Sequence, residues 1–356
     1  MRTSSVLFRI SAVVTCLLAL ASCTKDFTGR AIRFSASTRP DGDSKTKTVY
    51  SGEVVEGKER IDWGSGDKII LAMKNNEGQT SLVYSVNEIS TSGVNSKTGL
   101  EPFGTDDGLE WGEGSHDFWS GYPESVTVGD HTLSAEIPGE QIAYYDQKKN
   151  DVLLFNPDMN LAFMVAGLQS TPTDTGINLD FYPGMTTFDF TVGANADVTI
   201  VKFEMDTKAY ESETSVVVPL WGTAVATFDA ANGMAYSFSS VAPASSTDPA
   251  GQTIELTFND DKNATYHPIM STSTSMNFKV FALPQDLPGI RITFHFAGGT
   301  TKALRLKQND NWITFPATAK VNISGLLVPG ADWYINFDYP REEQWVIHPD
   351  IVIGVE

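Results

Sequence analysis

Cysteine is almost absent from this chain. Among its 356 residues there are two, Cys16 and Cys23. Cys16 lies inside a short apolar stretch that predicts an export signal, so only Cys23 is expected in the mature protein. A single cysteine excludes an internal disulfide, and the body of the protein must be held together by its core.

Positive charge is also scarce. The chain has 25 lysines and arginines against 44 aspartates and glutamates, which gives a formal net charge of −19. Nucleic acid and anionic lipid are bound by basic patches, so this balance argues against both as partners. Beyond residue 22 no apolar run approaches the roughly 18 residues that a membrane-spanning helix needs. The body is therefore expected to be acidic and to lie outside the bilayer.

The N-terminus has the features of a lipoprotein signal. Arg2 and Arg9 are followed by a short apolar stretch that ends in Leu-Ala-Ser-Cys at positions 20–23. A plain secretory signal has small residues before its cut but no cysteine at its edge. The pattern resembles a lipobox, so we predict a signal peptide over 1–22 and lipidation, such as palmitate, on Cys23. This predicts an outer-membrane or cell-surface lipoprotein, anchored by more than one acyl chain.

Helical periodicity is nearly absent, and apolar residues instead recur at every second position. Such alternation is typical of β-strands with one face on a core and one face toward solvent. Clear examples cover residues 32–36, 69–73, 82–86, 177–181, 188–192, 198–203, 254–258, 278–281 and 290–296. Clusters of Gly, Asn, Asp and Pro separate these stretches. We therefore predict an all-β fold built as two tandem, mainly antiparallel β-sandwiches.

The sequence contains none of the common catalytic motifs. A phosphate-binding loop, a His-Glu-x-x-His pair, a zinc spacing and a Gly-x-Ser-x-Gly elbow are all missing. The five histidines are scattered, and residues 259–263 offer oxygen ligands without the spacing of a calcium loop. We predict that the protein is not an enzyme, has no cofactor and has no metal site.

Seven short motifs follow one another along the chain. They are IDWGSGDKI at 61–69, FWSGYP at 118–123, IPGEQ at 137–141, PLWGT at 219–223, FALP at 281–284, LRLK at 304–307 and WITFPA at 312–317. Each motif alone has little specificity. In this order, and behind a lipobox, the sequence resembles the fimbrillins of Bacteroidales, the type V pilins.

The resemblance implies two transthyretin-like sandwich domains in a fimbrial subunit with a role in adhesion. It also implies donor-strand exchange, in which proteolysis removes the first strand and a strand of another subunit fills the groove. The partners would be other fimbrial subunits, the outer membrane through the lipid anchor, and host or bacterial surface ligands. The expected organisation is a signal peptide (1–22), a lipidated segment with the removable strand (23–48), two sandwich domains (49–195 and 196–344) and a donor strand (345–356).

The C-terminal segment has an apolar residue at every second position. These residues are Trp345, Ile347, Pro349, Ile351, Ile353 and Val355. Burying the three isoleucines and Val355 would contribute about 6–12 kcal/mol before ordering costs. Pro349 lacks an N–H, which disfavours a central position in a sheet. The segment is either the last strand of its own domain or a donor strand presenting Trp345, Ile347, Ile351, Ile353 and Val355.

The removable strand would cover residues 31–36, and the loop after it would have to be cut. Family members are processed after an arginine, often in a Thr-Arg-Thr-like stretch, whereas this chain has Lys47 between two threonines. Arg39 precedes a proline, a poor bond for trypsin-like proteases, and Arg60 immediately precedes the first motif. Either Lys47 serves a protease of wider specificity, or the strand stays and the subunit remains anchored as a base or terminal component.

A group of aromatic residues provides an alternative hypothesis. Its members are Trp111, Phe118, Trp119, Tyr122, Tyr144 and Tyr145. Exposed rings stack on sugars, which would fit a surface carbohydrate-binding lipoprotein of similar β-sandwich build. Rings that point inward would remove the basis of this hypothesis.

Overall fold

The computed structural model describes ten stretches of the chain. They are residues 29–37, 49–55, 58–64, 66–88, 97–104, 107–173, 176–243, 250–260, 262–308 and 310–327. No helix in these stretches is long and apolar enough to cross a membrane.

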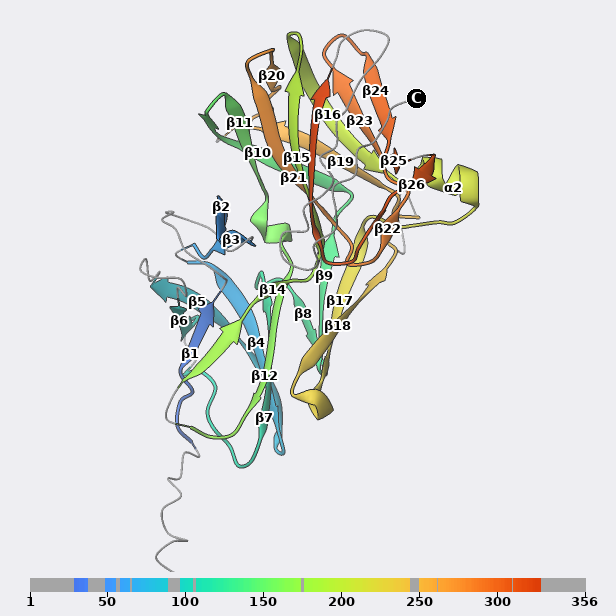
Figure 1. Ribbon diagram of the computed structural model, residues 1–356. Helices are drawn as coiled ribbons and strands as arrows, with labels where there is room; N and C mark the ends of the chain where they lie inside the picture. Colours follow the sequence, from blue (N-terminus) through green and yellow to red (C-terminus); the bar gives the residue numbers. More distant parts are fainter. Residues whose placement is uncertain are drawn as a thin grey trace, which may run out of the picture.

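The described chain is almost entirely β-structure, as the alternating sequence predicts (Figure 1). All nine stretches with clear alternation contain or overlap a strand. The exceptions to β-structure are one short helix, α2 (Lys208–Thr214), and the 3-10 turns η1 (Met159–Leu161) and η2 (Ala230–Asn232). The prediction of an all-β, mainly antiparallel fold is therefore confirmed.

The strands form three larger sheets and three two-stranded antiparallel pairs. The eight-stranded sheet has the order β13 (Ile177–Asp180), β1 (Phe34–Ser37), β6 (Lys97–Pro102), β5 (Gly78–Glu88), β4 (Lys68–Asn75), β7 (His116–Tyr122), β12 (Met164–Ser170), β14 (Tyr182–Pro183). The ten-stranded sheet has the order β24 (Thr301–Arg305), β23 (Arg291–Phe296), β16 (Val198–Asp206), β19 (Thr253–Asn259), β10 (Glu140–Lys149), β11 (Val152–Pro157), β21 (Ser275–Ala282), β15 (Thr186–Ala194), β28 (Lys320–Leu327), with β20 (Ile269–Met270) on β16. The four-stranded sheet has the order β18 (Ala235–Val241), β17 (Gly222–Asp229), β9 (Thr132–Ile137), β8 (Thr127–Gly129). The pairs are β2 (Val49–Val55) with β3 (Lys58–Asp62), β22 (Leu287–Pro288) with β27 (Thr314–Phe315), and β25 (Lys307–Gln308) with β26 (Asn311–Trp312).

Two separate hydrophobic clusters give the molecule its two lobes. The first cluster takes side chains from the eight-stranded and four-stranded sheets, in the lower lobe of Figure 1. The second cluster belongs to the ten-stranded sheet of the upper lobe and is rich in phenylalanine. Strands on either side of residue 195 share these sheets, since β10 pairs with β19 and β9 pairs with β17. The domain ranges 49–195 and 196–344 stay a prediction.

Three of the sequence motifs meet where the two lobes join. Gln141 is buried there, and its side-chain amide donates to the Phe281 carbonyl oxygen at 2.7 Å and accepts from the Phe281 N–H at 3.0 Å. The Leu283 N–H donates to the Leu220 carbonyl at 2.9 Å. Trp221 lies against Gly139, where a Cβ would come within 2.8 Å of the indole ring. The motifs at 137–141, 219–223 and 281–284 are therefore parts of one structural joint.

Replacing Gln141 with leucine is expected to lower the free energy of unfolding by about 2–4 kcal/mol, because it removes buried hydrogen bonds to backbone groups. Urea denaturation of the purified mature chain measures the effect. Glu140→Ala is the matched control, because Glu140 is the preceding residue of the same strand and its side chain is exposed. Equal stability of the two variants would contradict the proposed importance of the joint.

Candidate functional site: the seat of the first strand

The first strand lies between two strands that are distant from it in sequence. β1 runs antiparallel to β6, with Phe34 opposite Leu100, and parallel to β13, with Phe34 opposite Ile177. It is an internal strand of the eight-stranded sheet, so its removal would separate β13 from β6 (Figure 1). We call the groove that holds residues 29–37 the seat of the first strand.

The inward side of this segment belongs to the first hydrophobic cluster. Ile32, Phe34 and Ala36 are 6%, 5% and 0% exposed, respectively. The Phe34 ring makes edge-to-face contacts with Tyr84 and Phe118, at centroid distances of 5.4 and 5.6 Å. The alternation in residues 32–36 predicted a buried face, whereas the three-ring contact could not be seen in the sequence.

The start of the segment is bound by the chain just before β7. The Ile32 N–H donates to the Leu109 carbonyl at 2.8 Å, and the Trp111 N–H donates to the Arg30 carbonyl at 3.0 Å. The Tyr84 hydroxyl accepts from the Leu109 N–H at 2.8 Å, so the same ring that contacts Phe34 also positions this loop.

His116 braces the same loop from inside. Its Nε2 accepts from the Gly112 N–H at 2.9 Å, and its Nδ1 lies 3.2 Å from the Gly114 carbonyl oxygen. Burial lowers the pKa of His116, and the hydrogen bond to Gly114 only partly offsets this. The imidazole is therefore held neutral, with its proton on Nδ1.

The outward side of β1 is polar and bonded to β13. The Ser35 hydroxyl donates to Asn178 Oδ1 at 3.0 Å, and the Ser37 hydroxyl donates to the Asp180 carboxylate. The Asn178 amide in turn donates to Ser37 Oγ at 3.2 Å. Gly176 lets the two strands approach, since a Cβ there would lie 2.9 Å from the Arg33 carbonyl oxygen.

The first strand contributes a large part of the stability of its lobe. Full burial of one large apolar side chain contributes about 1.5–3 kcal/mol, so Ile32 and Phe34 together contribute about 3–6 kcal/mol. Native domains are typically stable by only about 5–15 kcal/mol. A seat left empty would therefore be unstable, and any strand removed from it must be replaced.

Most of the predicted site residues lie outside the described residues. These are Cys23, Arg39, Lys47, Trp345, Ile347, Ile351, Ile353 and Val355. Arg60 lies within β3, a strand paired with β2, whereas Lys47 falls in the interval between β1 and β2. Lipidation, processing and strand donation stay predictions.

The aromatic group that suggested sugar binding does not form an exposed platform. Trp111, Phe118, Trp119 and Tyr122 are each less than 5% exposed. Tyr144 and Tyr145 are half-buried, and Tyr145 stacks on Tyr266 at a centroid distance of 5.3 Å. Phe118 and Trp119 are neighbours in β7 and are both fully buried, so both faces of this strand are covered by other parts of the fold. The carbohydrate-binding hypothesis loses the observation that motivated it.

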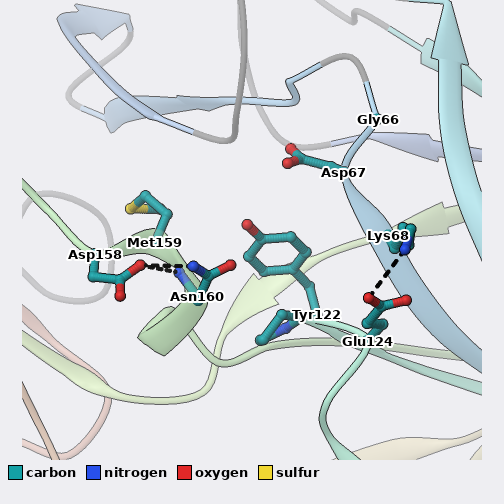
Figure 2. Close-up of a pocket in the computed structure, with 9 residues that line it drawn as sticks. Gly66, Asp67, Lys68, Tyr122, Glu124, Asp158, Met159 and Asn160 are labelled. Atoms are coloured by element: carbon teal, nitrogen blue, oxygen red, sulfur yellow. Dashed lines mark hydrogen bonds and ion pairs between the residues drawn. The ribbon is translucent and has the colours of Figure 1, made fainter. Parts of the chain in front are cut away.

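A cavity of about 290 Å³ opens beside the first motif and is lined by residues 66–68, 122–124 and 158–160 (Figure 2). Figure 2 shows the Tyr122 ring standing between Asp67 and Asn160. The charged groups around it already have partners: Lys68 Nζ lies 3.2 Å from Glu124 Oε1, and Asp158 accepts from the Asn160 N–H at 3.0 Å. Asp67 accepts from the Gly64 N–H at 2.7 Å, which closes the turn of the motif.

Within the described residues no group of acidic, His or Cys side chains is arranged to hold a metal ion.

Comparison with known proteins shows likeness at the level of structure. No protein-family model matches the chain, and no curated protein is significantly similar in sequence. A proposed cell adhesion protein of Bacteroides ovatus is 14% identical with a TM-score of 0.48, over 92% of this chain and 100% of that one. Another from Bacteroides fragilis is 14% identical with a TM-score of 0.45, over 90% and 99%. A fimbrial assembly protein of Parabacteroides distasonis is 10% identical with a TM-score of 0.34, over 85% and 93%.

Proposed function

We propose that this protein is a structural subunit of a surface fimbrium that is assembled by donor-strand exchange and serves adhesion. In this proposal Cys23 carries the lipid that brings the subunit to the outer membrane. Release of the first strand then opens the seat, and a strand from another subunit takes its place.

The position of β1 is the observation that carries the proposal. Residues 29–37 supply buried side chains to the first cluster, yet they pair with β6 and β13 and have no neighbouring strand close in sequence. A cut in the interval 38–48 would leave β1 attached to the rest of the protein by non-covalent contacts alone. An internal strand of this kind can be replaced by another strand that makes the same backbone hydrogen bonds.

The order of the chain links the anchor to the exchange. The lipid on Cys23 would be joined to β1, whereas the remainder of the fold begins at β2. A cut after Lys47 would therefore separate the anchored strand from the body. The segment 345–356, with its single apolar face, is the proposed donor for a neighbouring subunit.

Deleting residues 345–356 in the producing cells is expected to abolish surface polymers that contain this chain, because the subunit would have no strand to donate. Immunogold microscopy and heat-resistant ladders on denaturing gels measure polymer formation. The matched control replaces the polar His348 and Asp350 with serine and leaves the apolar face intact. Normal polymers from the deletion strain would exclude this segment as the donor.

N-terminal sequencing of surface material tests the release step in the same cells. We expect assembled subunits to begin after Lys47 and an anchored minority to begin at Cys23. Assembled subunits that all begin at Cys23 would show that the first strand stays in place.

A further inference from the structure

The seat of the first strand accommodates side chains of different sizes at successive inward positions. Along residues 32–36, an aliphatic residue (Ile32), an aromatic residue (Phe34) and a very small residue (Ala36) enter the core at alternate positions. Ser35, between Phe34 and Ala36, and Ser37, after Ala36, direct their hydroxyl groups to β13. A replacing strand must match both faces to recover what β1 contributes.

The Phe34 position is built for an aromatic ring. Tyr84 and Phe118 each present an edge-to-face contact to Phe34, and both are at most 1% exposed. Edge-to-face aromatic pairs add stabilisation beyond the area they bury. A β-branched aliphatic residue at this position would lose both pairs and leave part of the site unfilled.

The Ala36 position is built for a small residue. Ala36 is 0% exposed and lies between Leu179 of β13 and Thr98 of β6, which are 0% and 2% exposed. Protein cores are close-packed, so a larger side chain here forces strain on its neighbours. Isoleucine or valine would be overpacked at this point.

The C-terminal segment of this same chain does not match the seat in the direction of β1. With Ile347 at the Ile32 position, a proline falls on the aromatic position and an isoleucine on the small position. With Pro349 at the Ile32 position, the N–H that donates to the Leu109 carbonyl is also missing. With Ile351 at the Ile32 position, Glu356 faces the carboxylate of Asp180. Each register places the wrong side-chain class at two positions or more.

A nearby segment matches only in reverse. Ala331, Trp333 and Ile335 contain the three classes in the opposite order. They would have to run antiparallel to β13, where β1 runs parallel, and so would lose the observed ladder.

We infer that the strand received by this seat comes from a different subunit and not from another copy of this chain. The inference rests on the proposed donor-strand function and adds the identity of the partner. The incoming strand has an aliphatic, an aromatic and a small residue at successive inward positions, with small hydroxyl residues facing β13. This chain accordingly joins two unlike neighbours and does not form a homopolymer.

Peptide exchange on the mature chain tests the inference. A specific protease site is introduced within 38–48, the chain is cut there, and labelled peptides compete with the first strand. The peptides are residues 29–37, the natural tail 343–356, and two altered tails of identical composition. The matching tail carries Pro349→Phe, Asp350→Ser and Ile351→Ala, whereas the swapped tail carries Pro349→Ala, Asp350→Ser and Ile351→Phe.

We expect the matching tail to bind within about tenfold of the 29–37 peptide. The natural and swapped tails should bind about 100-fold more weakly, because each loses the aromatic contacts and overpacks the small position. A natural tail that binds within tenfold of the 29–37 peptide, or equal binding of the two altered tails, overturns the inference and leaves the proposed function intact. Failure of the 29–37 peptide itself to enter the cut chain contradicts the exchange mechanism, and both proposals then fall.

Discussion

Replacing Phe34 with alanine is expected to lower the free energy of unfolding of the first lobe by about 3–5 kcal/mol. The ring is 5% exposed and contacts Tyr84 and Phe118 edge-to-face. The substitution loses the transfer free energy of the ring and leaves a cavity in a core that cannot fully close. Both terms act at the place where β1 is held, so the strand should also open more often.

Two measurements check this prediction. Urea denaturation followed by tryptophan fluorescence includes the first lobe, because Trp63, Trp111 and Trp119 belong to its cluster, whereas Trp221 packs against the second cluster and adds signal from the other lobe. Hydrogen exchange at the Ile32 amide, which donates to Leu109, reports the seating of the strand. Ser35→Ala is the matched control, since it alters the outward face of the same strand and should cost about 1 kcal/mol or less. A Phe34→Ala variant as stable as Ser35→Ala would show that the seat does not depend on the ring.

Replacing Asp189 with alanine is expected to destabilise the second lobe by about 3–5 kcal/mol. Asp189 Oδ2 lies 3.0 Å from Lys279 Nζ and 3.2 Å from Lys320 Nζ, and Asn277 donates to Oδ1 at 2.6 Å. The side chains of the two lysines are 8% and 13% exposed. Removing the carboxylate leaves two buried ammonium groups close together. Their charges are then uncompensated, and this strongly destabilises the folded state.

The same carboxylate makes stability depend on pH in a defined direction. Burial by itself raises the pKa of Asp189, but the two lysines and the hydrogen bonds outweigh burial and lower the pKa to about 2. A folded-state pKa below the ordinary value of 3.8 means that the stabilisation is fully present above that value. It is lost as pH falls from about 4 toward 2. The Asp189→Asn variant should lack this part of the acid transition.

A triple replacement distinguishes the charge effect from a general packing defect. Asp189→Leu combined with Lys279→Met and Lys320→Met removes the whole ion cluster, and apolar substitution of this kind is often neutral or stabilising. Differential scanning calorimetry should find the triple variant more stable than Asp189→Ala. A triple variant as unstable as the single one would mean that the site responds to shape and not to uncompensated charge.

The strand content of the fold was readable from the sequence, but the partners of each strand were not. Alternation in residues 32–36 and 177–181 predicted two strands with buried faces. Their parallel pairing brings Ser35 against Asn178 across a separation of 143 residues. Alternation depends only on neighbouring residues, whereas pairing depends on which distant strands share a core. For the same reason Trp111 and Trp119 were compatible with an exposed platform until their burial was known.

The sequence by itself determined the scarcity of cysteine, the excess of acidic residues and the β-structure, because each follows from composition or from short-range periodicity. The signal peptide over 1–22 and the lipidation of Cys23 stay predictions. It also determined that the segment 345–356 has one apolar face. Only the tertiary structure decided that β1 lies inside a sheet and that its seat takes an aliphatic, an aromatic and a small residue in that order. Those sizes are set by Tyr84, Phe118, Thr98 and Leu179. Close packing of side chains distant in sequence defines such a site, and no local pattern contains that information.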